Sequence, residues 1–176
     1  MNVTPQSFHT PVKINLATIA RFFVIGIEAG ICSDDEARAW SFAVIAALEN
    51  PPGEIIELSW NKPRPSLRED LKAVKGIAEL EQVGHWLLGS LSVGNSPETG
   101  FWPLLRSAKH IVNATDLGKS LYYDLDIVAD EYELAERKIF GTTAEARHSF
   151  DALLAEFAPP PFANGWAGII FEPDNL

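Results

Sequence analysis

Cysteine is almost absent from this sequence, and so are the short motifs by which many enzymes are recognised. The single cysteine, Cys32, cannot form an internal disulfide, which excludes a disulfide-stabilised secreted scaffold. No set of Cys or His residues has zinc spacing, and the G-x-S-x-G, H-E-x-x-H, phosphate-loop and dinucleotide-binding patterns are missing. We therefore expect no resident metal or cofactor, and an enzyme only if its site is assembled from distant residues.

Long apolar runs and clustered basic residues are also missing. No stretch of about twenty apolar residues exists, so we expect no membrane-spanning helix. The apolar run after Arg21 is interrupted by Glu28 and lacks a convincing cleavage site, which favours a core helix over a signal peptide. Lysine and arginine number 14 against 24 acidic residues, and the net charge of −10 argues against DNA or RNA as a partner. A cytoplasmic protein is the expected class.

What remains is the composition of a globular helical protein. The chain has 176 residues, of which 47% are hydrophobic, and this is enough to bury one core, so we expect residues 1–176 to form a single domain. Apolar residues recur at steps of three and four along most of the chain. We predict an all-α bundle of about six or seven helices in successive antiparallel hairpins, with a short extended C-terminal segment.

The segment from Ser33 to Trp60 has the clearest helix signals. Ser33 and Glu36 have the spacing of a capping box, and the prolines of residues 50–53 end the helix that follows. Apolar residues, Phe42 among them, fall on both sides of this helix, which predicts a central helix with little surface facing water.

Further helices are predicted from the same signals. Ser66 and Thr142 each precede a glutamate by three residues, as in a capping box. The cleanest periodicity runs from Lys119 to Phe140, with Gly141 as a candidate C-terminal cap. Residues 54–60 are too few to assign by periodicity, and a helical turn and a buried strand are both compatible with them.

Three segments are predicted to lie outside the helices. Residues 1–11 are polar and contain two prolines, and we expect a flexible arm. Residues 92–100 collect Gly, Asn, Ser and Pro, which predicts an exposed loop. Residues 159–176 begin with three prolines, which end the preceding helix, and contain the apolar segment GWAGIIFEP. Because this segment is too apolar to be left in solvent, we expect the tail to dock on the bundle.

Negative charge is concentrated in the second part of the chain. Residues 1–115 hold 12 acidic and 10 basic side chains, whereas residues 116–176 hold 12 acidic and 4 basic ones. The acidic residues of the helix predicted from Lys119 avoid its apolar stripe and are expected on the outward side. A solvated face and a partner-binding face both fit this pattern. Trp102 follows the predicted loop and is added as a possible aromatic anchor. The candidate partner-binding residues are therefore Trp102, Asp124, Asp126, Asp130, Glu131 and Glu133.

The leading functional interpretation is an acidic binding protein that docks or neutralises a basic protein partner. Bacterial immunity proteins, which cover the cationic substrate site of a toxin, offer an analogy in size, charge and helical content, but no motif supports a closer relation. The alternative is a small enzyme or small-ligand-binding protein with a pocket between helices. Core packing and such a pocket both fit the apolar surroundings of four tryptophans, Trp60, Trp86, Trp102 and Trp166.

Two residues are candidates for catalysis under this alternative. His85 lies on an otherwise apolar helix and is a potential general base, although a structural histidine is the more common reading. Cys32 precedes a helix N-terminus, where the dipole would lower the thiol pKa, but it is also compatible with a small buried residue. Glu145 and His148 have the spacing of half a di-iron site, and because the other half is missing no metal site is predicted.

Overall fold

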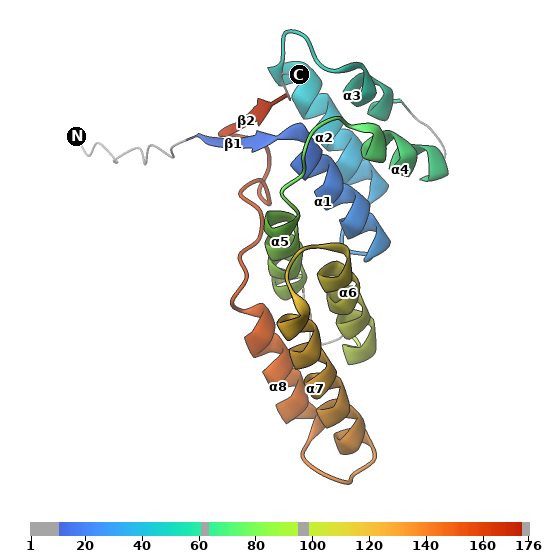
Figure 1. Cartoon of the computed structure of the whole chain (residues 1–176), viewed down its shortest axis with the longest axis vertical. Coiled ribbons are helices and arrows are strands. Elements are labelled where there is room, and N and C mark those ends of the chain that lie inside the picture. Colours follow the sequence, from blue (N-terminus) through green and yellow to red (C-terminus); the bar gives the residue numbers. More distant parts are fainter. Residues whose placement is uncertain (1–10, 61–63, 95–98, 174–176) are drawn as a thin grey trace, which may run out of the picture.

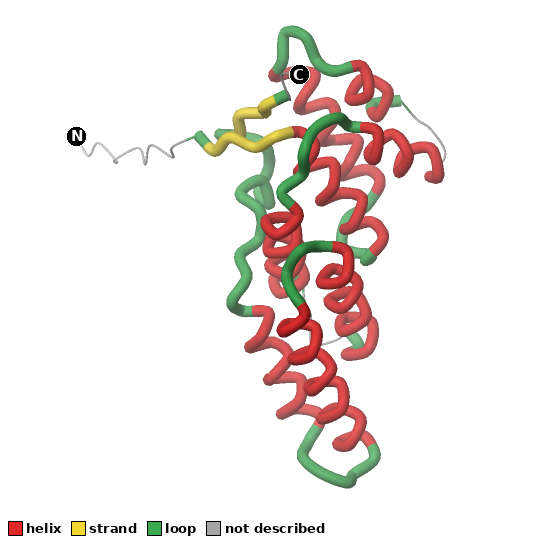
Figure 2. The backbone as a smooth tube through the Cα atoms, in the orientation of Figure 1, coloured by secondary structure: helices red, strands yellow, loops and turns green. Residues whose placement is uncertain are grey.

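The computed structural model of the chain describes residues 11–60, 64–94 and 99–173 (Figures 1 and 2). This part of the chain is mostly helical, as predicted, with a small two-stranded sheet added. It contains eight helices, more than the six or seven expected. In chain order the elements are β1 (Val12–Asn15), α1 (Leu16–Glu28), α2 (Asp34–Ala47), α3 (Gly53–Leu58), α4 (Arg64–Ala73), α5 (Leu80–Val93), α6 (Phe101–Ala114), α7 (Lys119–Glu136), α8 (Thr143–Leu154) and β2 (Ile169–Glu172).

Helix α1 lies at the centre of the core. Ten of its 13 residues are buried, and it packs against α4 and α5 and also contacts α2, α6 and β1. Asn15 caps its start by accepting a hydrogen bond from the backbone N–H of Thr18 at 2.7 Å. The prediction that α2 is the central helix is wrong, because Phe42 on its outer side is 56% exposed. An apolar side chain outside the main stripe of a helix can remain in solvent at little cost.

Of the three helix starts predicted from capping boxes, two are confirmed. At the start of α2, the backbone N–H of Ser33 donates to the carboxylate of Glu36, and the backbone N–H of Glu36 donates to the hydroxyl of Ser33. Thr142 and Glu145 form the same reciprocal pair at the start of α8. Helix α4 already begins at Arg64, so the start predicted at Ser66 is wrong by two residues. Residues 54–60, left open between helix and strand, lie mostly in α3.

The C-terminal segment returns to the start of the chain. Strand β2 pairs in parallel with β1, and Val12 lies opposite Ile169 in the register. Phe162 and Phe171 are buried in the core along the way. Strand β1 was not predicted. Residues 1–10 of the expected arm and residues 95–98 of the expected loop lie outside the described residues. That loop is shorter at its start than predicted, because Ser92 and Val93 still belong to α5.

Helix α7 ends earlier than its periodicity predicts. Its last helical residue is Glu136, and Lys138 adopts a left-handed conformation with φ of 57°. The N–H of Ile139 donates to the carbonyl of Leu134 at 2.9 Å and that of Lys138 to the carbonyl of Ala135 at 3.0 Å, which is the Schellman motif. The predicted end at Phe140 with Gly141 as the cap is therefore wrong.

The molecule is elongated, and α7 and α8 form one of its ends (Figure 1). These two helices pack closely against each other. Helices α5 and α6 lie between this end and the region around α1, while the sheet, α3 and α4 lie toward the opposite end. The acidic helix of the sequence therefore lies at an extremity and not in the middle of the fold.

Candidate functional site

The structure divides the acidic residues of α7 into paired and unpaired ones. Asp126 forms an ion pair with Lys109 of α6, and Glu133 forms one with Arg137 just beyond the end of α7. The Lys109 side chain is largely buried, whereas that of Asp126 is 45% exposed, so Asp126 lies where the outward side of α7 meets α6. These two carboxylates already have cationic partners within the chain.

Three other carboxylates of α7 are those of Asp124, Asp130 and Glu131, while that of Glu136 accepts a hydrogen bond from Trp102. None of the three forms an ion pair with a residue in the described part of the chain. Asp130 and Glu131 are exposed, and Asp124 is half-buried. Their charges are therefore the ones that a partner would meet.

Apolar side chains lie among these carboxylates on the solvent side of α7. Tyr123 is 63% exposed, Ile127 56%, and Leu134 is exposed as well. Steps of four and seven residues place the three on one side of a helix, opposite the buried Leu125 and Val128. The outward side of α7 is thus an apolar stripe bordered by acidic residues. We call it the outer surface of α7, made of Tyr123, Asp124, Ile127, Asp130, Glu131 and Leu134.

Trp102 lies at the junction of α6 and α7. Its indole Nε1 donates a hydrogen bond to Glu136 at 3.2 Å, and its ring meets Tyr132 edge to face at 5.5 Å between centroids. The Phe101 ring stacks on the same Tyr132 ring, with 3.8 Å between centroids. Trp102 is 38% exposed. Its contacts are with the α6 side of α7, so the structure does not bring it together with the outer surface.

Cys32 does not have the environment of a reactive cysteine. Burial raises the pKa of its thiol to about 12, and the nearby carboxylate of Glu36 raises it as well. The prediction that the helix N-terminus lowers this pKa is wrong, because loss of hydration and a neighbouring negative charge outweigh the dipole. The thiol is therefore protonated at neutral pH and is a poor nucleophile.

His85 lines an open hollow together with Glu79, Glu81 and Asp116. Its ring packs against Phe157 at 5.3 Å between centroids. Within the described residues, His85 forms no hydrogen bond or ion pair. A general base that is oriented by a carboxylate is thus not assembled around His85 in this conformation.

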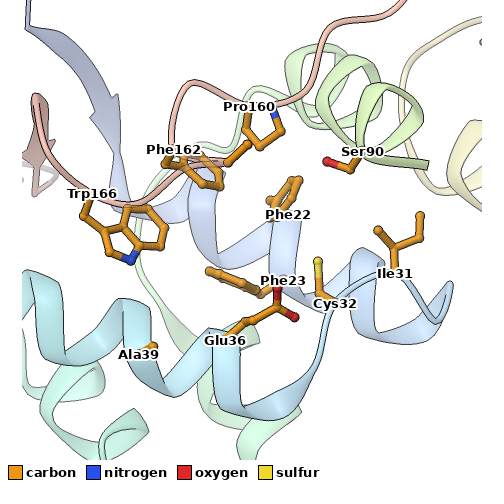
Figure 3. Close-up of a pocket in the computed structure, with 11 residues that line it drawn as sticks. Phe22, Phe23, Ile31, Cys32, Glu36, Ala39, Ser90, Pro160, Phe162 and Trp166 are labelled. Atoms are coloured by element: carbon orange, nitrogen blue, oxygen red, sulfur yellow. The ribbon is translucent and has the colours of Figure 1, made fainter. Parts of the chain in front are cut away.

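A second cavity, whose lining includes four aromatic rings, lies between α1, α2, α5 and the segment after α8 (Figure 3). Its volume is about 250 Å³. We call it the aromatic pocket. Its walls are the rings of Phe22, Phe23, Phe162 and Trp166 with Ile31, Cys32, Ala39, Pro160 and Ala163, and its polar side chains are those of Glu36 and Ser90.

The candidate metal pair is already used for another purpose. The carboxylate of Glu145 accepts hydrogen bonds from the backbone N–H and hydroxyl of Thr142 in the capping box of α8. Among the residues that the structure describes, no group of three or more His, Cys, Asp or Glu side chains is arranged to hold a metal ion. The described helices also include none that is long and apolar enough to span a bilayer.

Comparisons with known proteins give no relative for this chain. No family model, no curated protein and no solved structure matches it. The functional argument therefore depends on the two features described above, the outer surface of α7 and the aromatic pocket.

Sequence reasoning missed both of these features in part. The outer surface was seen as acidic only, although the spacing of Tyr123, Ile127 and Leu134 is visible in the sequence as a second apolar stripe on the same helix. The aromatic pocket was out of reach, because Phe22 and Phe162 come from opposite parts of the chain. Of its lining residues, the sequence singled out only Trp166, Cys32 and Glu36.

Proposed function

We propose that this protein binds a basic protein partner through the outer surface of α7. The observation that carries the proposal is an apolar stripe, Tyr123, Ile127 and Leu134, left in solvent between carboxylates that have no cation of their own. Large apolar side chains grouped on one face of a helix are typical of an interaction site. The carboxylates beside them favour a partner that carries lysine or arginine.

The two parts of this surface have different roles in the proposed interaction. Burial of the apolar stripe supplies affinity, at about 25 cal/mol for each Å² of apolar surface removed from water. Asp130 and Glu131 supply long-range attraction, which raises the association rate and is screened by salt. A second copy of this chain is a poor occupant, since it would place the same unpaired carboxylates against each other and the net charge is −10.

The position of α7 suits such a role. It lies at one end of an elongated molecule, packed on α6 and α8 (Figure 1). The turn that follows it exposes Ile139 and Phe140, so apolar surface continues to the tip. If the interaction is of the immunity type, the partner is a toxin whose cationic site is covered. We place the interaction in the cytoplasm.

The test compares substitutions on and off the outer surface. Ile127→Glu removes part of the apolar stripe, and Glu131→Lys reverses one unpaired charge. Glu49→Lys is the matched control, because Glu49 is exposed, lies in the segment between α2 and α3, and forms no ion pair with a described residue. Helix α3 lies toward the end of the molecule opposite α7 (Figure 1). Each immobilised protein is incubated with extract of the native host at low salt, and a captured protein is purified for kinetic measurements.

The proposal requires a basic protein that binds wild type and Glu49→Lys equally well but binds the other two variants at least about tenfold more weakly. Its association rate with wild type should fall as salt is added, and this dependence should be weaker for Glu131→Lys. Equal binding to all four proteins, or a captured partner without excess basic residues, would show that the outer surface of α7 is not the binding site.

A further inference from the structure

We propose that the aromatic pocket is a binding site for a small organic cation, either a quaternary ammonium or a protonated amine. This inference concerns a different face of the fold from the outer surface of α7, and it stands or falls separately from the proposed function. It depends on three observations: the ring arrangement in the pocket, the carboxylate of Glu36 at its edge, and the absence of a basic side chain among the described residues that line it.

The rings form walls in more than one direction. Phe22 meets Phe162 at 90° with 5.2 Å between centroids, and it meets Phe23 at 81° with 5.5 Å. Trp166 stacks on Phe162 at 4.7 Å and 19°. Aromatic faces carry partial negative charge and attract a cation within about 6 Å of the ring centre, whereas they offer nothing comparable to an anion. Because these rings lie in different planes around one small cavity, a compact cation inside it would be flanked by aromatic surface from more than one direction.

Glu36 provides the charge. Its Oε2 accepts hydrogen bonds from the backbone N–H and the hydroxyl of Ser33 at 2.7 and 2.8 Å, and no described residue donates to its Oε1. The side chain is exposed and borders the same cavity as the rings (Figure 3). A cation held against the rings could therefore lie close to the free oxygen of this carboxylate.

Other charges near the pocket do not cancel this one. The start of α2 carries about half a positive charge from the helix dipole. The full negative charge of Glu36 in the first turn exceeds this partial charge, so the sum of the two stays negative. The other titratable side chain that lines the pocket is Cys32, which is neutral. The remaining polar group is the hydroxyl of Ser90 on α5, which can accept or donate a hydrogen bond.

Size limits the ligand to a compact one. The cavity of about 250 Å³ is below the range of about 300–1,000 Å³ that is typical for drug-sized ligands. A trimethylammonium group with a short polar tail fits this description. Choline is therefore the probe, and 3,3-dimethylbutan-1-ol is its neutral counterpart, with the same shape but carbon in place of the charged nitrogen.

The chain offers a closely matched pair of variants for the test. Glu36→Gln removes the negative charge, yet glutamine serves in a capping box as glutamate does, so the start of α2 is retained. Glu145→Gln makes the same change in the equivalent capping box of α8, which is not part of the pocket. Thermal denaturation of both variants verifies that the fold is intact.

Binding is followed by titration calorimetry and by the indole N–H signals in NMR spectra of the protein. We expect choline to shift the signal of Trp166, assigned with Trp166→Phe, and to bind at least about tenfold more tightly than 3,3-dimethylbutan-1-ol. Glu36→Gln should weaken choline binding by about tenfold or more, and Glu145→Gln should leave it unchanged.

Three results would overturn the inference. Equal binding of choline and the neutral alcohol would define an apolar pocket without preference for a cation. Unchanged choline affinity in Glu36→Gln would remove the carboxylate from the site. No response of Trp166 to millimolar choline in a folded protein would show that the pocket does not accept this class of ligand.

Discussion

Lys109 of α6 and Asp126 of α7 form an ion pair, and the Lys109 ammonium group also lies 5.5 Å from the centre of the Tyr122 ring. This contact fixes α7 against α6 at the border of the outer surface, since Asp126 lies one helical turn before Asp130. A charge on α7 therefore has one of two roles, according to whether a cation of the chain pairs with it. Asp126 helps to hold the helices together, while Asp130 is left for the solvent or a partner.

The first prediction separates these two roles. Asp126→Lys places a second ammonium group against that of the partly buried Lys109. We expect the free energy of unfolding, measured with urea, to fall by about 1–3 kcal/mol. Asp130→Lys changes the net charge equally but breaks no contact among the described residues, so its effect should stay within about 0.5 kcal/mol. Equal stability of the two variants would contradict the structural role of Asp126.

A second prediction concerns the contact between Gly89 of α5 and the backbone of the C-terminal segment. A Cβ atom on Gly89 would lie only 2.2 Å from the backbone carbonyl carbon of Ala158, so Gly89→Ala must displace the chain that leads to Pro160 and Phe162. We expect a loss of about 1–3 kcal/mol in unfolding free energy, together with a changed Trp166 signal, because this chain forms one wall of the aromatic pocket.

Gly53→Ala is the control for this substitution. A Cβ atom there meets nothing within 4 Å, and the backbone of Gly53 does not require glycine. Its stability should be unchanged or slightly higher, since alanine favours the helix that begins at this residue. A comparable loss in both variants would show that the contact with Ala158 is not the cause.

The sequence predicted the features whose cause lies within a few neighbouring residues. Ser33 and Glu36 lie three positions apart, so their capping box depends on no distant part of the chain, and the same holds for Thr142 and Glu145. The pairing of Val12 with Ile169 is different. The sequence predicts a short extended segment near the C-terminus, but four residues carry too little pattern to identify β1 or its pairing with β2, which only the folded core brings side by side.

The end of α7 illustrates a further limit of periodicity. Ile139 continues the step of three and four residues, but the helix stops at Glu136 and Lys138 turns into the left-handed region. A lysine at this position gives no signal, since glycine is the usual residue there. The outer surface of α7 shows the same limit: the helix carries two apolar stripes, and periodicity alone does not say which of them is buried.

The third prediction follows from Lys138. Its φ of 57° strains a residue with a Cβ atom, and Lys138→Gly should relieve that strain and raise the unfolding free energy by about 0.5–1 kcal/mol. Lys138→Ala removes the same charge without relieving the strain, so it should give no such gain. Chemical denaturation of both variants is the measurement, and equal gains in the two would assign the effect to charge instead of conformation.

The fourth prediction concerns the reactivity of Cys32. The pKa of about 12 in the folded protein compares with about 8.5 for an unperturbed thiol. At pH 8 we expect iodoacetamide to alkylate the folded protein at least on the order of 100-fold more slowly than the protein unfolded in urea, because only the thiolate reacts. The folded-state rate should continue to rise above pH 9, where an ordinary cysteine levels off.

The same shift predicts how stability depends on pH. Since the pKa of Cys32 is raised by folding, the unfolded chain releases this proton first, and the stability that the neutral thiol contributes is present below about pH 8.5 and lost as the pH rises toward 12. The stability difference between wild type and Cys32→Ala should therefore shrink over that range, with other titrating groups common to both proteins. A constant difference, or alkylation as fast in the folded as in the unfolded protein, would mean that the thiol is ionised or accessible. Cys32 would then return as a reactive residue, and Glu36 would no longer be the only charge at the edge of the aromatic pocket.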